Sequence, residues 1–143
     1  MASVGFDSRD AAMIVGAKPS GTTATTVGSN PIDLGPIDAE GVRSEPFELE
    51  LAIPAFTATE LPADATLTIK LQSCAASDFS ANVTDHISQS IGDGTAYSGG
   101  TIRFRVTLKG DRYWRAAVTT TLANSGAVAD TAQAKEIVLS YVC

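Results

Sequence analysis

The sequence has few of the residues on which catalysis and metal binding depend. Its 143 residues include one histidine, two cysteines and one tryptophan, and aromatic residues make up only 6%. An enzyme of the cupin kind needs a cluster of metal-binding histidines, so the single His86 excludes that class. Cys74 and Cys143 lack the spacing of a metal or redox motif, which leaves either free thiols or one bridge between them. We therefore expect no metal and no cofactor.

Positive charge is also scarce. The sequence has ten Lys and Arg residues and 16 Asp and Glu residues, which gives a formal net charge of −6. Nucleic-acid binding needs clustered basic side chains, so we expect no nucleic-acid partner. The imbalance is uneven, because residues 1–64 hold ten acids and three bases whereas residues 65–143 hold six acids and seven bases. This asymmetry predicts charged faces that dock on copies of the chain or on a charged partner.

Long apolar runs are missing as well. No stretch approaches the length of a membrane span, so we expect no membrane partner. Near the start, Asp7, Arg9 and Asp10 precede an apolar run over residues 11–15 that is too short for a signal peptide. We therefore expect the protein to stay in the compartment where it is made.

What the sequence has in abundance is alternation of apolar and polar residues. Period two is typical of a strand with one buried face, and turn residues recur about every ten positions. This pattern predicts an all-β antiparallel sandwich, a jelly roll of about eight strands over residues 16–143, preceded by an N-terminal arm over residues 1–15. The predicted strands are residues 22–27, 30–34, 47–53, 66–73, 87–91, 102–108, 113–122 and 136–142. Two alanine-rich segments, 75–81 and 127–134, could each form a helical turn or two.

The same alternation predicts which side chains are buried and which are exposed. The central core is predicted to consist of Leu67, Ile69, Leu71, Phe104 and Val106. On the face opposite its apolar residues, the strand predicted at 47–53 carries Glu48 and Glu50. The strand predicted at 102–108 carries Arg103 and Arg105 in the same way. We expect assembly to be partly electrostatic, between this acidic face and this basic face, with solvation of both faces as the alternative.

Nothing in the chain has the pattern of a catalytic centre. His86 has Asp85, Ser88 and Ser90 nearby, but residues adjacent on a strand point apart, so we interpret His86 as a solvated loop residue. The glycine-rich segment 92–100 lacks a dinucleotide-binding pattern and is interpreted as a hairpin connection. We predict that the protein is not an enzyme.

One segment has the composition of an interface. Arg112, Tyr113, Trp114 and Arg115 follow one another, and Trp, Tyr and Arg are enriched at interface anchors. The alternative is that Tyr113 and Trp114 open a strand with one ring in the core and with solvated arginines. The candidate interface residues are Arg103, Arg105, Arg112, Tyr113, Trp114, Arg115, Glu48 and Glu50.

Three segments, in the right order along the chain, are similar to a known family. Phe6-Asp7-Ser8-Arg9-Asp10-Ala11 resembles a short "F-S-D-A-Q-A" arm, Asn30-Pro31-Ile32-Asp33-Leu34-Gly35 resembles an "N-V-I-D-L-G" strand, and Gly110-Asp111-Arg112-Tyr113-Trp114-Arg115 resembles an "R-Y-x-R" strand entry. The family is that of the capsid cement or decoration proteins of tailed phages of the podovirus type, which have jelly-roll subunits. The chain departs from it at Pro31, where the pattern has Val.

The resemblance implies a structural role without catalysis. Family members bind the outer surface of the phage head, stabilise contacts between major capsid proteins and associate with themselves. It therefore implies a virion protein made in the host cytoplasm, whose partners are the major capsid protein and copies of itself, as a homodimer or homotrimer. The alternative is a carbohydrate- or receptor-binding β-sandwich module of a phage particle.

Overall fold

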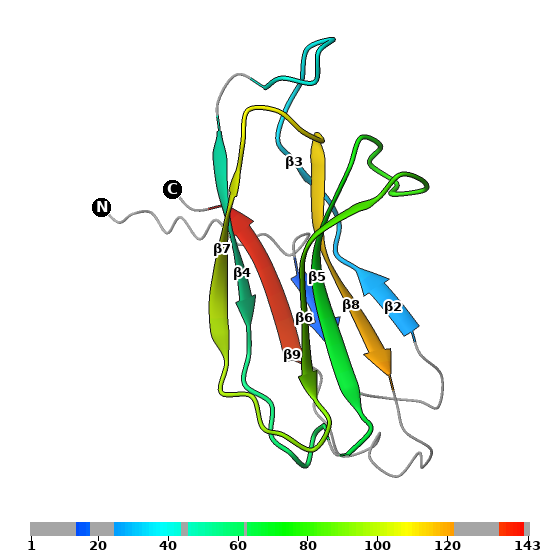
Figure 1. The fold of residues 1–143 in the computed structure, drawn as a ribbon, viewed down its shortest axis with the longest axis vertical. Coiled ribbons are helices and arrows are strands. Elements are labelled where there is room, and N and C mark those ends of the chain that lie inside the picture. The colour runs from blue at the N-terminus through cyan, green and yellow to red at the C-terminus, as the bar shows by residue number, and fades with distance from the viewer. Residues whose placement is uncertain (1–13, 18–24, 44–45, 62, 122–134, 142–143) are drawn as a thin grey trace, which may run out of the picture.

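The chain is built from strands. The computed structural model describes residues 14–17, 25–43, 46–61, 63–121 and 135–141, and within them it contains nine strands and no helix (Figure 1). The strands are β1 (Ile14–Ala17), β2 (Thr25–Gly28), β3 (Ile32–Asp33), β4 (Phe47–Ile53), β5 (Thr66–Cys74), β6 (Thr84–Gly92), β7 (Gly100–Val106), β8 (Tyr113–Thr121) and β9 (Lys135–Tyr141).

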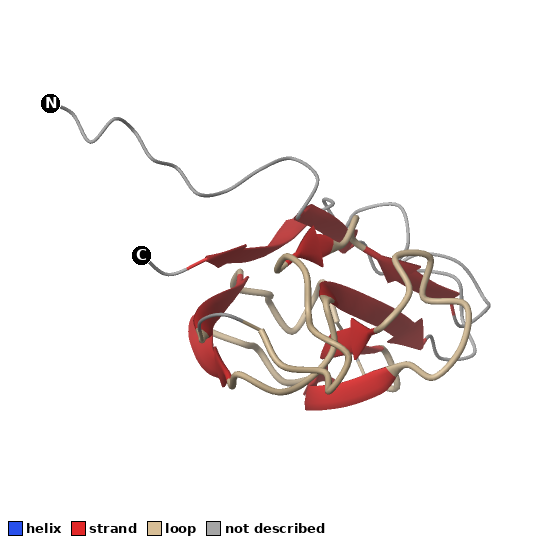
Figure 2. Ribbon diagram, turned by 90° about the horizontal axis from the view of Figure 1, so that it is seen from above, coloured by secondary structure: helices blue, strands red, loops and turns tan. Residues whose placement is uncertain are grey.

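The strands form two antiparallel sheets. One has the order β1-β9-β4-β7, and the other has the order β2-β8-β5-β6 with β3 also paired to β8. Figure 2 looks roughly along the strands of these two sheets. β6 and β7 are consecutive in the chain, yet each is an edge strand of a different sheet. The expected all-β antiparallel class with two sheets is confirmed, whereas the segment between β6 and β7 is not a hairpin: it carries the chain from one sheet to the other.

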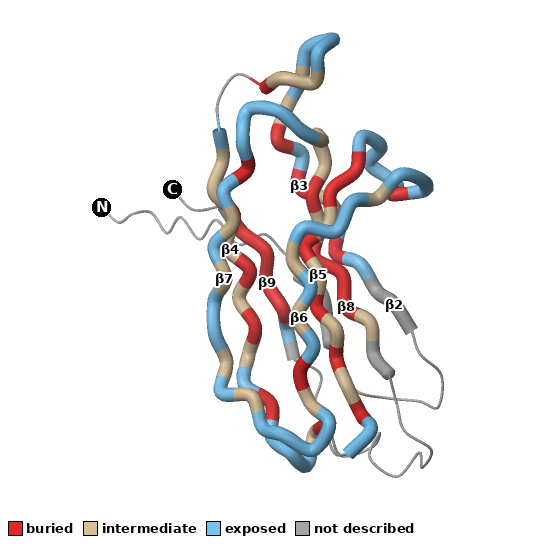
Figure 3. Tube along the Cα trace, in the orientation of Figure 1, coloured by how far each residue is buried: buried red, intermediate tan, exposed pale blue. Residues whose placement is uncertain are grey.

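The core lies between the sheets and follows the period of two. Buried residues alternate with half-buried ones along β4 and β5 (Figure 3). Of the predicted core residues, Leu67, Ile69, Leu71 and Val106 are at most 2% exposed, while Phe104 is only partly buried and packs against the edge of the core. The core prediction is therefore confirmed for four residues and corrected for Phe104, which lies at the open margin between the edge strands β6 and β7.

Element boundaries differ from the sequence prediction in several places. β7 ends at Val106, so Leu108 lies outside the strand and is 45% exposed. β3 begins directly after Pro31, which has no N–H to offer a neighbouring strand. β1 was not predicted, and the boundary placed at residue 15 falls inside it; residues 1–13 of the arm lie outside the described residues.

The alanine-rich segments do not add a helix to the described structure. Residues 75–81 form bends and a turn closed by the N–H of Phe79, which donates to the carbonyl of Ala76 at 3.2 Å. Segment 127–134 lies outside the described residues. Cys74 is a buried free thiol whose Sγ donates to the carbonyl of Ala81 at 3.1 Å, and Cys143 also lies outside the described residues.

Candidate functional site

A pocket opens between the two edge strands β6 and β7. Its volume is about 330 Å³. Three rings and Val106 line it, and its polar side chains come from the end of β5, from β6, and from β7 with the residues that follow it. The members used below are Ser73, His86, Phe104, Arg105, Lys109, Asp111 and Trp114. We call it the β6–β7 pocket.

An irregularity in β6 turns His86 toward this pocket. Leu71 pairs with Ile87 and Gln72 pairs with Asp85, so His86 is an extra residue that no β5 residue opposes. Such a β-bulge re-aims the side chain that it inserts. Asp85 faces the outer side of the sheet, where it accepts hydrogen bonds from Lys70 Nζ at 2.9 Å and Gln72 Nε2 at 2.8 Å. His86 was interpreted as a solvated loop residue; it is exposed, but the loop assignment is corrected, because His86 belongs to β6 and lines the pocket.

The His86 ring belongs to an aromatic cluster at the pocket wall. It stacks on Trp114, with ring centroids 4.3 Å apart and an interplanar angle of 28°. The Phe104 ring is tilted toward both, 5.3 Å from His86 and 5.5 Å from Trp114 between centroids. His86 keeps an exposed rim while one face is covered. Burial lowers the pKa of His86 from its ordinary value, and the negative charges of Asp111 and Asp85 act in the opposite direction.

Ser73 links His86 to Asp111 by hydrogen bonds. Its Oγ donates to Asp111 Oδ2 at 2.6 Å and lies 2.7 Å from His86 Nε2. A hydroxyl carries one proton, so the second bond must run from the Nε2–H of His86 to Ser73 Oγ. Neutral His86 therefore keeps its lone pair on Nδ1.

The order of these three groups differs from that of a hydrolytic triad. In a triad the histidine stands between the carboxylate and the serine and removes the serine proton. Here Ser73 stands in the middle and donates its hydrogen bond to Asp111, so its proton is directed away from His86, which is not placed to act as its base. The arrangement positions the three side chains and does not activate a nucleophile.

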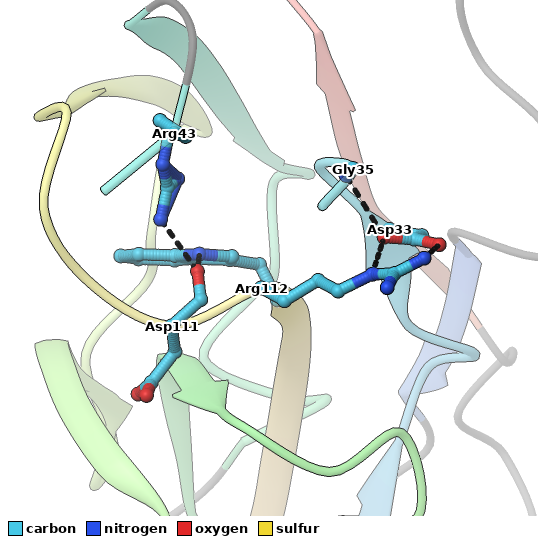
Figure 4. A network of polar contacts seen from close by, with 6 residues as sticks. Asp33, Gly35, Arg43, Asp111 and Arg112 are labelled. Carbon is cyan, nitrogen blue, oxygen red and sulfur yellow. Dashed lines mark hydrogen bonds and ion pairs between the residues drawn. The ribbon is translucent and has the colours of Figure 1, made fainter. Parts of the chain in front are cut away.

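The other wall of the pocket, residues 107–112, is hydrogen-bonded to the loop that precedes β4 and to the start of β8. The N–H of Arg43 donates to the carbonyl of Leu108 at 2.7 Å, and the N–H of Gly110 donates to that of Gly41 at 3.1 Å. Arg43 Nη2 also donates to the carbonyl of Asp111 at 2.6 Å (Figure 4), and Trp114 Nε1 donates to the same oxygen at 3.0 Å. These bonds fix the wall before any ligand is present.

Arg43 is itself unusual. It is 3% exposed, and its Nε and Nη1 atoms are buried without a hydrogen-bond partner. Burial lowers its pKa, and the charge of Asp111 opposes this effect. The two unpaired donors cost free energy, while the remaining nitrogen, Nη2, holds the pocket wall through its bond to the carbonyl of Asp111.

The acidic and basic residues predicted on separate faces lie on the same face of one sheet. β4 and β7 pair in a register that sets Glu48 opposite Arg105 and Glu50 opposite Arg103. Arg103 lies 3.4 Å from Glu50 and 3.8 Å from Glu48, measured between nitrogen and carboxylate oxygen. The expectation of separate charged faces is therefore wrong, because the strands that carry them are neighbours. Arg105 differs, since it forms no ion pair within the described part of the chain and lines the β6–β7 pocket.

The segment from Arg112 to Arg115 is used largely within the molecule. Arg112 binds Asp33 with two hydrogen bonds, Nε to Oδ1 at 2.6 Å and Nη2 to Oδ2 at 2.8 Å (Figure 4), and this hydrogen bonding lowers the pKa of Asp33. Trp114 is 2% exposed and therefore belongs to the core rather than to an exposed anchor. Tyr113 is half-buried beneath the Arg112 guanidinium, 5.2 Å from its ring centroid.

Arg115 spans the outer face of its sheet. It donates to Gln72 Oε1 at 3.0 Å, and its guanidinium carbon lies 4.3 Å from the ring centroid of Phe79. A Cβ at Gly28 would lie 2.8 Å from Arg115 Nη1, so a larger residue there would require the Arg115 guanidinium to shift. Whether any of these residues contacts a partner stays a prediction.

Ser73 and Asp111 were not recognised as site residues. One signal was present: Ser73 continues the inward parity of Leu67, Ile69 and Leu71, and a polar residue at a buried strand position needs a partner. The bulge at His86 has no comparable signature in a single sequence.

The described residues bring together no group of three or more His, Cys, Asp or Glu side chains that could hold a metal ion. None of them forms a helix with the length and apolarity that a membrane crossing requires. Comparisons with protein-family models, with curated proteins and with solved structures find no match.

Proposed function

We propose that the two sheets form a jelly roll. The strand pairing supports this, because the pairs are nested along the chain: β1 with β9, β2 with β8, β4 with β7, and β5 with β6. Such nesting arises when one long antiparallel hairpin is rolled so that successive pairs fall in alternate sheets. The sheet orders 1-9-4-7 and 2-8-5-6 are those that this rolling produces.

We further propose that the chain is a non-enzymatic capsid cement or decoration subunit of a tailed phage. It would bind the outer surface of the head and stabilise contacts between major capsid proteins, with copies of itself as further partners. One observation carries the proposal: two of the three segments that resemble this family, far apart in sequence, form one structural unit. Ile32 pairs with Trp114 and Asp33 with Tyr113, while Arg112 clamps Asp33.

The surface chemistry is compatible with a role of this kind. Binding to a symmetric shell adds many modest contacts through multivalency and needs no reactive centre in each subunit. The hydroxyl of Ser73 is not activated by His86, which supports the non-enzymatic part of the proposal.

The test is to add the purified protein to phage heads assembled without it and to image the particles by electron cryomicroscopy. We expect additional density at defined positions on the outer surface and a higher temperature of head disruption. Ile69→Asp, which should not fold, is the matched control for non-specific adhesion. Heads that show no added density at saturating protein would contradict the proposal.

The second candidate is a carbohydrate- or receptor-binding module, which the ring-lined β6–β7 pocket favours. Sugar binding usually needs an accessible ring face, but Trp114 is 2% exposed and its ring is covered by His86. A glycan array would distinguish this candidate by selective binding that depends on the pocket residues.

A further inference from the structure

We propose that the β6–β7 pocket binds an organic carboxylate with a flat apolar body, such as an arylalkyl carboxylate. This inference does not depend on capsid binding. Two sources carry this chemistry, a free organic acid and a protein segment with a carboxylate beside an aromatic ring, and the experiment below separates them.

The apolar part of the ligand is indicated by the pocket wall. The partly buried ring of Phe104 and the exposed rim of His86 border the opening, while Val106 and Trp114 are at most 2% exposed beneath them. The ring centroids of Phe104, His86 and Trp114 lie within 5.5 Å of one another. A wall of this kind takes a flat group in edge or offset contact. The volume of about 330 Å³ lies at the lower end of ligand pockets, which favours a small body.

The anionic part is indicated by two cations at the rim. Arg105 and Lys109 line the pocket, and neither forms an ion pair within the described ranges. Asp111 is the one acid among the described residues that line it, and Ser73 already donates to one of its oxygens. Glu48 stands opposite Arg105 in the strand register but lies 3.8 Å from Arg103, so Arg105 and Lys109 are the cations of the pocket without an ion pair of their own among the described residues. A ligand carboxylate would pair with these cations.

The site is preorganised from both sides. The β-bulge holds His86 over Trp114 on the β6 side, and the bonds from Arg43 hold the carbonyls of Leu108 and Asp111 on the other. Because these groups are fixed in advance, a ligand would lose little of its binding energy to ordering the protein.

His86 adds a dependence on pH. Its Nε2–H is committed to Ser73, so the second proton goes to Nδ1, the nitrogen left for a ligand. The charged groups around it are Asp85 on its own strand, which Lys70 engages, and Asp111, Arg105 and Lys109 across the pocket. A bound carboxylate favours the imidazolium, so binding takes up a proton and strengthens as the pH falls through the histidine range.

The test is a titration of the full chain with phenylacetate, followed by NMR. Acetate, which lacks the ring, and benzyl alcohol, which lacks the charge, are the ligand controls. We expect shifts at Phe104, His86 and Asp111, with phenylacetate binding more tightly than either control. The dissociation constant should be lower at about pH 5.5 than at about pH 7.5, and His86→Asn should remove most of that difference.

The neighbouring arginines supply a matched pair of variants. Arg105→Gln removes a cation that lines the pocket and should weaken phenylacetate binding about three- to tenfold. Arg103→Gln removes the same charge from the same strand at a residue paired with Glu48 and Glu50, and should leave the affinity unchanged. Thermal melting of both variants is the control that they fold.

Three results would overturn the proposal: no shifts at the pocket residues, equal affinity for acetate and phenylacetate, or equal effects of the two arginine variants. The source is assigned with a capped Phe-Asp dipeptide. Tighter binding of the dipeptide, with the same sensitivity to Arg105→Gln, assigns the carboxylate to a partner protein. Tighter binding of phenylacetate assigns it to a free acid.

Discussion

His86 occupies its place because one residue is inserted into β6. The insertion breaks the alternation, brings the ring onto Trp114 and sets Nε2 against Ser73. Without it, His86 and Ile87 would point to opposite sides of the sheet. A bulge beside a pocket is a common position for a re-aimed side chain, and here it supplies the one group on the pocket wall that titrates near neutral pH.

We predict that His86 titrates below the ordinary histidine value of about 6.5. Burial disfavours its charged form, and Asp111 only partly opposes this effect. Asp111→Asn should lower the pKa further, because it removes a negative charge that stabilises the imidazolium. His86 is the single histidine of the sequence, so its ring signals in an NMR titration need no assignment. A pKa at or above the ordinary value would show that the ring is solvated.

The same shift has a consequence for stability. Because the pKa of His86 is lower in the folded than in the unfolded state, the unfolded chain binds more protons in the interval between the two values. The contribution of His86 is therefore fully present above the unfolded pKa and is lost as the pH falls toward the folded pKa. Urea unfolding should show a shallower loss of stability for His86→Asn than for the natural chain over this interval.

At the scale of elements, β5 is the strand on which the core depends. Ile69 lies at its middle, is fully buried, and pairs with β6 on one side and β8 on the other. We predict that Ile69→Asp prevents folding, because burying a carboxylate without a partner costs more than about 4 kcal/mol. Thr68→Asp, one residue away on the outer face, should remain folded. Circular dichroism and gel filtration check both, and a cooperative Ile69→Asp protein would show that the assigned face is wrong.

The charges on β4 and β7 stabilise the pairing of these strands. Glu50 and Arg103 are opposite one another in the register and form an ion pair. Arg103→Glu should destabilise the fold, and Glu50→Arg combined with it should recover part of the loss, with a coupling of about 0.2–1 kcal/mol. Urea unfolding of the four proteins in this cycle measures the coupling, which should shrink at high salt. Zero coupling would mean that both side chains are merely solvated.

The elements show where sequence reasoning succeeds and where it stops. β4 was predicted with its observed bounds because its alternation is strict, and β5 was one residue short. The pairing of Glu50 with Arg103 could not be predicted. Alternation along a strand shows which face of the sheet a side chain is on, but it does not show which strand lies next to it. The pocket was missed for the same reason: Ser73, His86 and Asp111 meet only once β5, β6 and the loop before β8 are placed together.

At the scale of the whole molecule, pairing joins distant parts of the chain. β1 pairs with β9, so Ile14 lies opposite Val138, and β2 pairs with β8. The fold therefore closes only when both ends of the described chain are in place. A deletion near the N-terminus is tolerated only if it stops before β1.

We predict that deletion of residues 2–12 leaves the sandwich folded and weakens assembly. β1 begins at Ile14, and its pairing with β9 involves Ile14 to Ala17 alone, so the deletion removes no described strand residue. The free energy of unfolding should change by less than about 0.5 kcal/mol, while occupancy on phage heads and self-association fall, because the polar residues Asp7 to Asp10 are expected to contact neighbouring subunits. Urea unfolding, sedimentation and imaging of decorated heads measure the three quantities. A deletion that unfolds the domain would mean that this segment is part of the core, and unchanged occupancy would place the assembly contacts elsewhere on the sandwich.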